Sequence, residues 1–313
     1  MNILGKRYYY FLFSLILIVP GLIVLAIYGM PMAIDFTGGS YLEVQFASGK
    51  APEPGQAIEL YNEMGISDVQ ANTTKSSSSL ENDDILVLRS TFIDDNVRAQ
   101  LVTTMSERFN DTITVRNFNS VGPTIGAEVT QRALLAILVA ALGVILFITF
   151  SFRGVNHAFR YGICAIIAMA HDVLVVISLS AIGGHFFGWQ VDSLFLTAML
   201  TVIGFSVQDK IVVFDRIREN SGIYRKLPFE KLANHSIIQT LQRSINTQLM
   251  TSEFMLLALA LFGGVTLREF CVILLVGLAS GTYSSIFIAA PILVVWENKE
   301  WKTWFKRSQT TEA

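Results

Sequence analysis

Long apolar stretches dominate this chain, and they constrain its fold more than any other feature. A helix needs about 20 mostly apolar residues to cross a bilayer. Six stretches approach or exceed that length, at 10–28, 133–152, 161–183, 193–213, 249–264 and 270–296. Of the 313 residues, 52% are hydrophobic and only 15% are charged, a composition too apolar for a soluble protein of this size. We therefore expect a polytopic α-helical membrane protein with six transmembrane helices.

Lysine and arginine residues predict the orientation of these helices. They precede the first stretch, lie between the second and third, and follow the fourth and sixth, whereas loop 184–192 has neither and the loop near Arg268 has one. Because basic residues accumulate in cytoplasmic loops, both termini are expected in the cytoplasm. The predicted organisation is a cytoplasmic N-terminus and first span at 1–30, an external domain at 31–131, a five-span bundle at 132–296 and a cytoplasmic tail at 297–313.

The external segment has the pattern of a small α+β domain. Apolar and polar residues alternate in 40–46, 84–89 and 112–118, which predicts strands, and a weaker strand is expected at 68–72. Residues 55–64 and 94–109 are amphipathic, with Asp94 placed as an N-cap, and 72–83 is a polar loop. The order β-α-β-β-α-β is typical of a ferredoxin-like domain. The segment contains no histidine or cysteine, so we expect a partner-binding or chain-binding domain, with no catalytic residues, metal or cofactor.

Two glycine-containing motifs flank this domain. Asp35, Gly38 and Gly39 belong to DFTGG at 35–39, and Gly122, Pro123 and Gly126 belong to VGPTIG at 121–126. Glycine permits tight turns, and proline suits the first turn of a helix. We interpret both motifs as hinges of defined conformation between span and domain. A domain that moves relative to the spans would need such hinges.

The fourth stretch continues into charged residues within a single segment, 197–220. Gln208, Asp209 and Lys210 occur side by side before an arginine-rich end. An Asp or Lys at the centre of a span costs roughly 2.5–3.5 kcal/mol, and such groups often mark ion or proton pathways. Asp209 is therefore either a proton carrier or a fixed hydrogen-bonding group between helices.

Six motifs in order resemble the SecF subunits of the bacterial protein-export apparatus, members of the SecD/SecF family. They are DFTGG at 35–39, VGPTIG at 121–126, AHDV at 170–173, FDRIREN at 214–220, LFGG at 261–264 and GTYSSIFIA at 281–289. The resemblance covers the chain from the first span to the sixth. It implies a six-span protein of the bacterial inner membrane, similar to half of an RND-type transporter, with a large first periplasmic loop.

The resemblance also implies partners and a role. SecF-like proteins pair with a SecD-like subunit and act with the SecYEG channel, and the pair is thought to use the proton gradient to draw an unfolded preprotein across the membrane late in export. Neither enzymatic activity nor nucleic-acid binding is implied, and membrane lipid surrounds the spans. Two alternatives stay open: a stand-alone RND-like exporter of small molecules, and a non-conducting scaffold of the translocase.

The family motifs assign expected roles to individual residues. Asp209 matches the family's intramembrane acid, Arg243 a basic residue before the fifth span, and His171 and Asp172 the AHDV element; together they form the expected proton relay. Arg243 could equally be a cation at the cytoplasmic edge. His171 could equally be a hydrogen-bonding group between helices, with Asp172 its companion or a partner for a SecD residue.

Two further expectations concern the spans and their ends. Asp215, Arg216 and Arg218 are expected to form a salt-bridged cap at the cytoplasmic end of the fourth span. Gly277 and Gly281, followed by Thr282, Ser284 and Ser285, fit a helix-packing surface and nothing more.

The chain also departs from the family at two points. Lys210 replaces the usual Thr or Ser after the acid, and Glu253 replaces the usual Gly in the fifth span. Because consecutive spans are often adjacent, we expect Lys210 and Glu253 to form an intramembrane ion pair. Such a pair could retune the proton relay or replace it.

Overall fold

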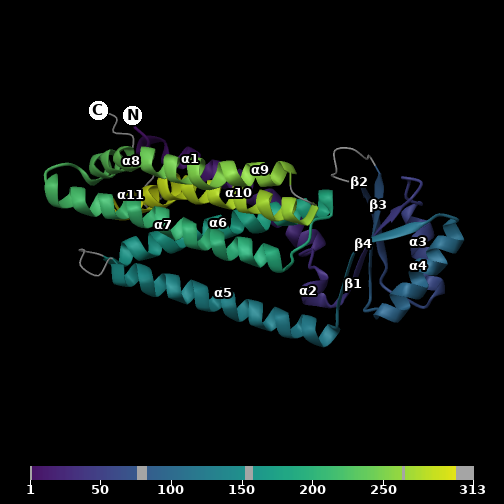
Figure 1. Ribbon diagram of the computed structural model, residues 1–313. Helices are drawn as coiled ribbons and strands as arrows, with labels where there is room; N and C mark the ends of the chain where they lie inside the picture. The colour runs from purple at the N-terminus through teal and green to yellow at the C-terminus, as the bar shows by residue number, and fades with distance from the viewer. Residues whose placement is uncertain (1, 76–82, 152–157, 263–264, 301–313) are drawn as a thin grey trace, which may run out of the picture. The chain divides into compact units, whose positions relative to one another are not determined.

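The computed structural model describes residues 2–75, 83–151, 158–262 and 265–300. The chain divides into two units. One comprises Met1–Pro31, Ile137–Trp189 and Leu194–Ala313, and the other comprises Met32–Ala136 and Gln190–Ser193. The first is helical, and the second contains the sheet (Figure 1).

The smaller unit is built on a four-stranded sheet with two helices on one face (Figure 1). Its elements are α2 (Ile34–Thr37), β1 (Gly39–Phe46), α3 (Pro54–Glu63), β2 (Gln70–Lys75), β3 (Asp84–Ser90), α4 (Asp95–Phe109) and β4 (Ile113–Val121). The strand order is β2-β3-β1-β4, and every neighbouring pair is antiparallel. Alternate β1 residues Leu42 and Val44 pack with Tyr61 of α3 and Met105 of α4 in one buried core.

The predicted strands and helices of this unit are confirmed, with bounds that differ by at most three residues. Asp94 caps α4 as expected, because its side chain accepts a hydrogen bond from Val97 N at 2.8 Å. The strand expected at 68–72 lies instead at Gln70–Lys75, since its pairing with β3 continues to Lys75 opposite Asp84. Backbone hydrogen bonds extend a strand past the point where apolar alternation ends. The predicted loop 72–83 falls partly outside the described residues.

The helical unit contains the elements that carry the apolar stretches. They are η1 (Leu4–Lys6), α1 (Arg7–Tyr28), α5 (Pro123–Ser151, which begins in the smaller unit), α6 (Ala158–Phe187), α7 (Ser193–Ile223), α8 (Phe229–Ile245), the π-helix η2 (Asn246–Glu253), α9 (Phe254–Phe262), α10 (Val265–Ser284), the π-helix η3 (Ser285–Ala289) and α11 (Ala290–Glu297). Among the described residues, 5 helices are long and apolar enough to cross a membrane. A polytopic helical membrane protein is therefore confirmed.

One predicted span, 249–264, is not among these five. Its segment begins within the polar η2, and the apolar α9 that follows has 9 residues, fewer than the roughly 20 that a span needs. Residues 263 and 264 lie outside the described residues. This span, the fifth of the six in chain order, stays a prediction.

Small residues bring the helices of this unit into close contact. A Cβ on Gly277 would lie 2.2 Å from Val202 Cγ2 of α7, and one on Gly281 would lie 3.3 Å from Ser206 Cα. The expected packing surface on α10 is thus confirmed. By this contact α10 lies against α7 and places its serine side chains inside the bundle.

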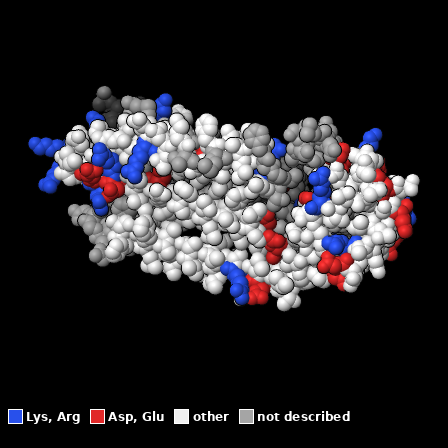
Figure 2. All heavy atoms as spheres, viewed as in Figure 1, with Lys and Arg blue, Asp and Glu red and all other residues white. Residues whose placement is uncertain are grey.

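The surface of the helical unit is mostly uncharged (Figure 2). Large apolar side chains of α5 such as Leu134 and Leu138 are exposed, as expected for helices that face lipid. Lysine and arginine gather at the end of this unit where α7 is followed by α8 (Figures 1 and 2). This pattern is consistent with a multi-pass membrane protein.

Candidate functional site: two buried carboxylates among the helices

Asp172 of α6 lies at the centre of a buried polar network. Its side chain is 1% exposed. Its Oδ2 atom accepts hydrogen bonds from Lys210 Nζ at 2.7 Å, Ser206 Oγ at 2.6 Å and Ser284 Oγ at 2.7 Å. Its Oδ1 atom accepts one from Ser280 Oγ at 2.7 Å. Helices α7 and α10 thus both supply donors to one carboxylate of α6.

Lys210 is the cation of this network, and it is fully buried. Its ammonium nitrogen lies 2.7 Å from Asp172 Oδ2, in an ion pair that water does not reach. The expected Lys210–Glu253 pair is corrected accordingly, because the structure pairs Lys210 with Asp172. The expectation rested on adjacent spans and on a height difference of several ångström that a lysine side chain can bridge, but Lys210 contacts Asp172 of α6 and Ser284 of α10, whereas Glu253 lies in η2. Height alone did not decide the partner.

Asp209 is the second buried carboxylate, and its surroundings differ. It is 7% exposed. Ser244 of α8 donates to its Oδ1 atom at 3.0 Å, and Ser285 of η3 donates to its Oδ2 atom at 3.2 Å. Within the described part of the chain, no lysine, arginine or histidine forms an ion pair with it. Asp209 is held by hydroxyl groups, whereas Asp172 is held by hydroxyl groups and a cation.

The two carboxylates are linked by neighbouring serines at the point where α10 becomes a π-helix. Ser284 is the last residue of α10 and binds Asp172, while Ser285 is the first residue of η3 and binds Asp209. A π-helical turn inside a helix often marks a functional site. Our interpretation of these serines as a packing surface alone was incomplete, because their hydroxyl groups hold both acids.

Most of the hydroxyl partners were not predicted from the sequence. One available signal was spacing, since Ser280 and Ser284 are one helical turn apart in an apolar helix, and so are Ser206 and Lys210. Polar residues that share one face of a membrane helix point to a common partner. Ser244 offered no comparable signal, because it follows a polar stretch of α8.

His171 and Arg243 occupy very different positions. His171 is buried, and its Nδ1 atom lies 3.1 Å from Asp172 Oδ1, so the two residues are companions as expected. Its Nε2 atom is buried without a hydrogen-bond partner among the described residues. Arg243 is exposed on α8, next to Ser244. Its place in a proton relay stays a prediction.

The residues of the expected cap form ion pairs near the end of α7. Arg218 pairs with Asp215 at 2.5 Å, and Arg216 pairs with Glu219 at 2.6 Å. Arg216 also donates from Nε to Gln239 Oε1 of α8 at 2.7 Å. These contacts connect consecutive turns of α7 and join α7 to α8.

In the smaller unit, the two glycine-containing motifs lie against each other. Gly38 and Gly39 have φ angles of 74° and 125°, which favour glycine. A Cβ on Gly126 would lie 2.7 Å from Gly38 N, so the backbones of the two segments are in contact. Asp35 Oδ2 accepts hydrogen bonds from Ser193 N at 2.9 Å and Ser193 Oγ at 2.5 Å.

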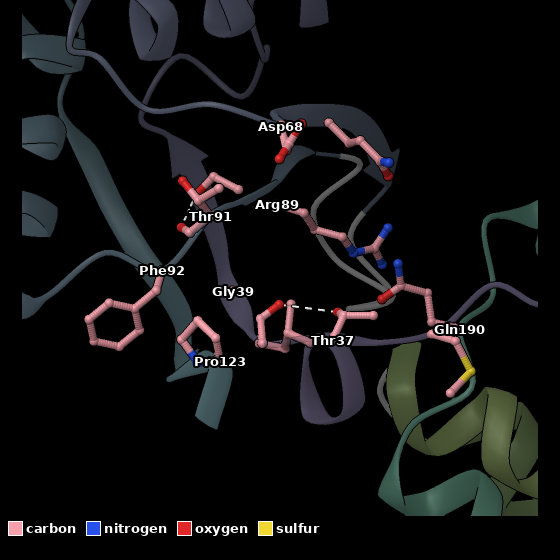
Figure 3. A pocket seen from close by; sticks show the side chains of 13 residues that line it. Thr37, Gly39, Asp68, Arg89, Thr91, Phe92, Pro123 and Gln190 are labelled. Atoms are coloured by element: carbon pink, nitrogen blue, oxygen red, sulfur yellow. Dashed lines mark hydrogen bonds between the residues drawn. The ribbon is translucent and has the colours of Figure 1, made fainter. Parts of the chain in front are cut away.

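A pocket of about 320 Å³ opens beside these motifs (Figure 3). Thr37 and Gly39 line one side of it, and Asp68, Arg89 and Gln190 line another. Its lining mixes charged, amide and apolar side chains. The pocket contains no cluster of histidine, cysteine or acidic residues that could hold a metal ion, and none occurs elsewhere in the described chain.

Comparisons with known proteins agree on one family. Residues 101–299 match the family "Protein export membrane protein SecD/SecF, C-terminal", and residues 23–49 match the "SecD/SecF GG Motif". The Protein translocase subunit SecF of Anaerolinea thermophila is 68% identical over 98% of this chain and 97% of that protein. The Protein translocase subunit SecF of Thermobaculum terrenum is 44% identical over 100% of this chain and 99% of that protein.

A solved structure is similar as well. The crystal structure of SecDF, a translocon-associated membrane protein from Thermus thermophilus, superimposes with a TM-score of 0.80 at 31% identity. The match covers 95% of this chain and 39% of SecDF, so the chain spans about two fifths of that protein.

Proposed function

The chain belongs to the SecF branch of the SecD/SecF protein-export family, and from this premise we propose that it couples the proton motive force to late steps of protein export, with Asp209 as its proton carrier. Its relatives are translocase subunits, so it is a transport subunit of the membrane and not an enzyme. What is proposed is the proton motive force as the energy source, late export as the step, and Asp209 as the residue that carries the proton.

The observation that carries this proposal is the contrast between the two buried acids. An isolated carboxylate is costly to bury, and a buried acid avoids that cost by pairing with a cation or by taking up a proton. Asp172 has its cation in Lys210 at 2.7 Å, whereas Asp209 is held by the hydroxyl groups of Ser244 and Ser285 and forms no ion pair among the described residues. Asp209 is therefore the acid suited to gain and lose a proton.

The position of Lys210 weighs against the scaffold alternative. That alternative supposed that the new lysine replaced the relay with a static ion pair. The lysine does form a static pair, but its partner is Asp172. Asp209, the proposed relay acid, and Lys210, the α7 member of the ion pair, are different residues of α7. The presence of Lys210 therefore does not by itself remove a proton carrier. The small-molecule exporter gains no support from relatives that are translocase subunits.

The proposed architecture is a six-span protein of the bacterial inner membrane with both termini in the cytoplasm. The segment 249–264 would be the fifth span, and 31–131 would be a ferredoxin-like periplasmic domain. The strand order β2-β3-β1-β4 and its antiparallel pairing support the ferredoxin-like arrangement. The basic residues that follow α7 support the orientation.

We propose a SecD-like subunit, the SecYEG channel and an unfolded preprotein as partners. In SecDF of Thermus thermophilus, the part that resembles this chain belongs to a longer polypeptide. A separate SecD-like chain would supply the remainder here. The external domain would move relative to the spans as protons pass, and the motifs at Gly38 and Gly126 would connect the two parts.

The test is gradient-dependent export in membrane vesicles that contain SecYEG, the SecD-like partner and this protein. A preprotein already partly threaded would be allowed to complete translocation with and without a proton gradient. We expect the gradient to speed completion for the wild-type protein and not for Asp209→Asn. Asp209→Asn keeps the size of the side chain; its oxygen can accept from one serine and its amide nitrogen can donate to the hydroxyl oxygen of the other, so it removes titration with little loss of packing.

One control and one contrary outcome decide the interpretation. Asp215→Asn, at the exposed end of the same helix, should respond to the gradient like the wild type. If Asp209→Asn retains the full gradient-dependent gain, Asp209 is a structural hydrogen-bonding group and the proposal is wrong.

A further inference from the structure

The ammonium of Lys210 is enclosed by oxygen atoms. Its nitrogen lies 2.7 Å from Asp172 Oδ2, 2.5 Å from Ser206 Oγ, 2.9 Å from Ser284 Oγ and 3.3 Å from the Ser206 carbonyl oxygen. These atoms come from α6, α7 and α10, and the three side chains are almost completely buried. We refer to Asp172, Ser206 and Ser284 as the oxygen cradle.

The hydroxyl groups of the cradle are oriented toward a cation. Ser206 and Ser284 each donate their own proton to Asp172 Oδ2, at 2.6 and 2.7 Å. A serine hydroxyl has one proton and two lone pairs. The contact of Ser284 Oγ with Gly281 O is longer, at 3.2 Å, so in the shorter hydrogen bonds both protons point to the carboxylate and lone pairs of both hydroxyl groups face the ammonium. A carboxylate, two hydroxyl oxygens and a carbonyl oxygen are also the ligand types that hard cations take in proteins.

Further contacts hold the carboxylate in place. Ser280 Oγ donates to Asp172 Oδ1 at 2.7 Å, and His171 Nδ1 lies 3.1 Å from the same atom. Oxygen Oδ1 is thus occupied, and only Oδ2 faces the cation. Outer contacts of this kind orient the ligands of an ion site.

We propose that the oxygen cradle is a monovalent-cation site of the Na⁺ type, and that Lys210 is its permanent tethered occupant. The lysine supplies the charge that a free ion would otherwise supply, and its presence keeps Na⁺ out. The wild-type protein is therefore indifferent to Na⁺ at this position. Shortening Lys210 leaves a buried, negatively charged cradle that a free cation, or a proton on Asp172, has to neutralise.

The test measures thermal stability and ion binding on the full-length protein in detergent micelles, without any gradient or export reaction. Wild type, Lys210→Ala and the exposed-lysine control Lys231→Ala would be unfolded in choline chloride and in NaCl at equal ionic strength. Binding of radioactive sodium would be measured in parallel. The outcome is separate from that of the export assay, so failure of one proposal is distinguishable from failure of the other.

The expected result is a Na⁺ response confined to Lys210→Ala. Its Tm should fall in choline chloride and rise saturably with NaCl, because a ligand that binds only the folded state stabilises it. Its binding of sodium should saturate near one ion per chain, and that binding should be lost in Lys210→Ala/Asp172→Asn. The wild type and Lys231→Ala should show neither effect.

Several results would overturn the proposal. One is an equal Na⁺ response in the wild type, and another is a response that survives Asp172→Asn in the double variant. A third is a Lys210→Ala protein that folds but does not respond to Na⁺, which would make Lys210 an ordinary structural partner of Asp172. If neither Lys210→Ala nor the smaller polar change Lys210→Ser yields folded protein even in NaCl, Na⁺ does not substitute for the ammonium and the proposal also fails.

Discussion

At the scale of single residues, Asp172 and Asp209 are both buried between helices but differ in the charge of their partners. Serine hydroxyl groups hold each acid, but among the described residues only Asp172 has a cation at ion-pair distance. The charge of Asp172 is therefore compensated by Lys210, and the two residues depend on each other. A change to one partner alone leaves the other charge buried without compensation.

Asp172→Asn should lower the free energy of unfolding by about 3–5 kcal/mol, because it leaves the Lys210 ammonium buried and unpaired. The double variant Asp172→Asn/Lys210→Met removes both charges and should recover most of that loss. Denaturant unfolding in micelles would measure both effects. If the double variant is as unstable as the sum of its single variants, the two residues are not coupled.

Asp111 allows a test of pH dependence outside the spans. Hydrogen bonds lower the pKa of its carboxyl group, chiefly those from Ser48, and Thr112 N also donates to it at 2.7 Å. A lowered folded-state pKa stabilises the protein above the unfolded-state pKa of about 3.9, and this contribution is lost as pH falls through the folded-state value. Unfolding between about pH 5 and pH 2 should therefore depend on pH more steeply in the wild type than in Asp111→Asn. Identical slopes would show that these hydrogen bonds have no effect.

At the scale of elements, close approach between segments depends on glycine. On α10, Gly277 and Gly281 allow contact with α7, and this contact brings Ser284 and Ser285 to the two acids. In the smaller unit, Gly126 allows its helix to lie against the backbone at Gly38. Each contact has a nearby glycine that makes no such contact and can serve as its control.

Gly277→Ala should destabilise the helical unit by about 1–3 kcal/mol, the usual cost of overpacking. The new Cβ would lie 2.2 Å from Val202 Cγ2 and 3.1 Å from Val176 Cγ2, so α10 has to move outward. Gly204→Ala on α7 is the control, because nothing lies within 4 Å of its Cβ. Thermal unfolding of both variants would measure the difference, and equal Tm values would contradict the packing argument.

Gly126→Ala should separate the two glycine-containing motifs. Its Cβ would lie 2.7 Å from Gly38 N and 3.1 Å from Phe36 O, and backbone atoms cannot rotate away as a side chain can. Gly122→Ala, with open space at its Cβ, should have little effect. Limited proteolysis of both variants would show whether residues near Gly38 become more accessible. Equal cleavage would mean that this contact does not hold the connection.

At the scale of the whole molecule, the open question is how many times the chain crosses the membrane and in which direction. Among the described residues, five helices meet the requirements of a span, and the segment 249–264 would bring the number of spans to six. An even number of crossings places both termini on one side, and the basic residues predict that this side is the cytoplasm.

Single cysteines at exposed positions would test this topology. The native Cys164 and Cys271 are buried and would be replaced by alanine. In intact cells with a permeabilised outer membrane, a maleimide that cannot cross the inner membrane should label Lys50→Cys and Arg268→Cys. It should label Arg225→Cys only after lysis. Labelling of Arg268→Cys only after lysis would show that 249–264 does not cross the membrane, and labelling of Lys50→Cys only after lysis would reverse the orientation.

The secondary structure of both units could be predicted from local pattern. Apolar length identifies the spans, and two-residue alternation identifies strands such as 40–46, because both signals depend on a residue and its near neighbours in the chain. Asp94 was recognisable as a cap for the same reason. The family, too, was identifiable from motifs alone, since six short segments occur in one order.

The partners of buried charges could not be predicted in this way. The sequence placed Asp172, Asp209 and Lys210 inside spans and thereby determined that each needs a partner or a use. Only the packing of α6, α7 and α10 decided that Lys210 pairs with Asp172, and that Ser244 and Ser285 hold Asp209. The physical reason is that a helix presents a different side chain about every 100° of rotation, so neighbours such as Asp209 and Lys210 face different helices. Which helix each one faces is a property of the bundle and not of the local sequence.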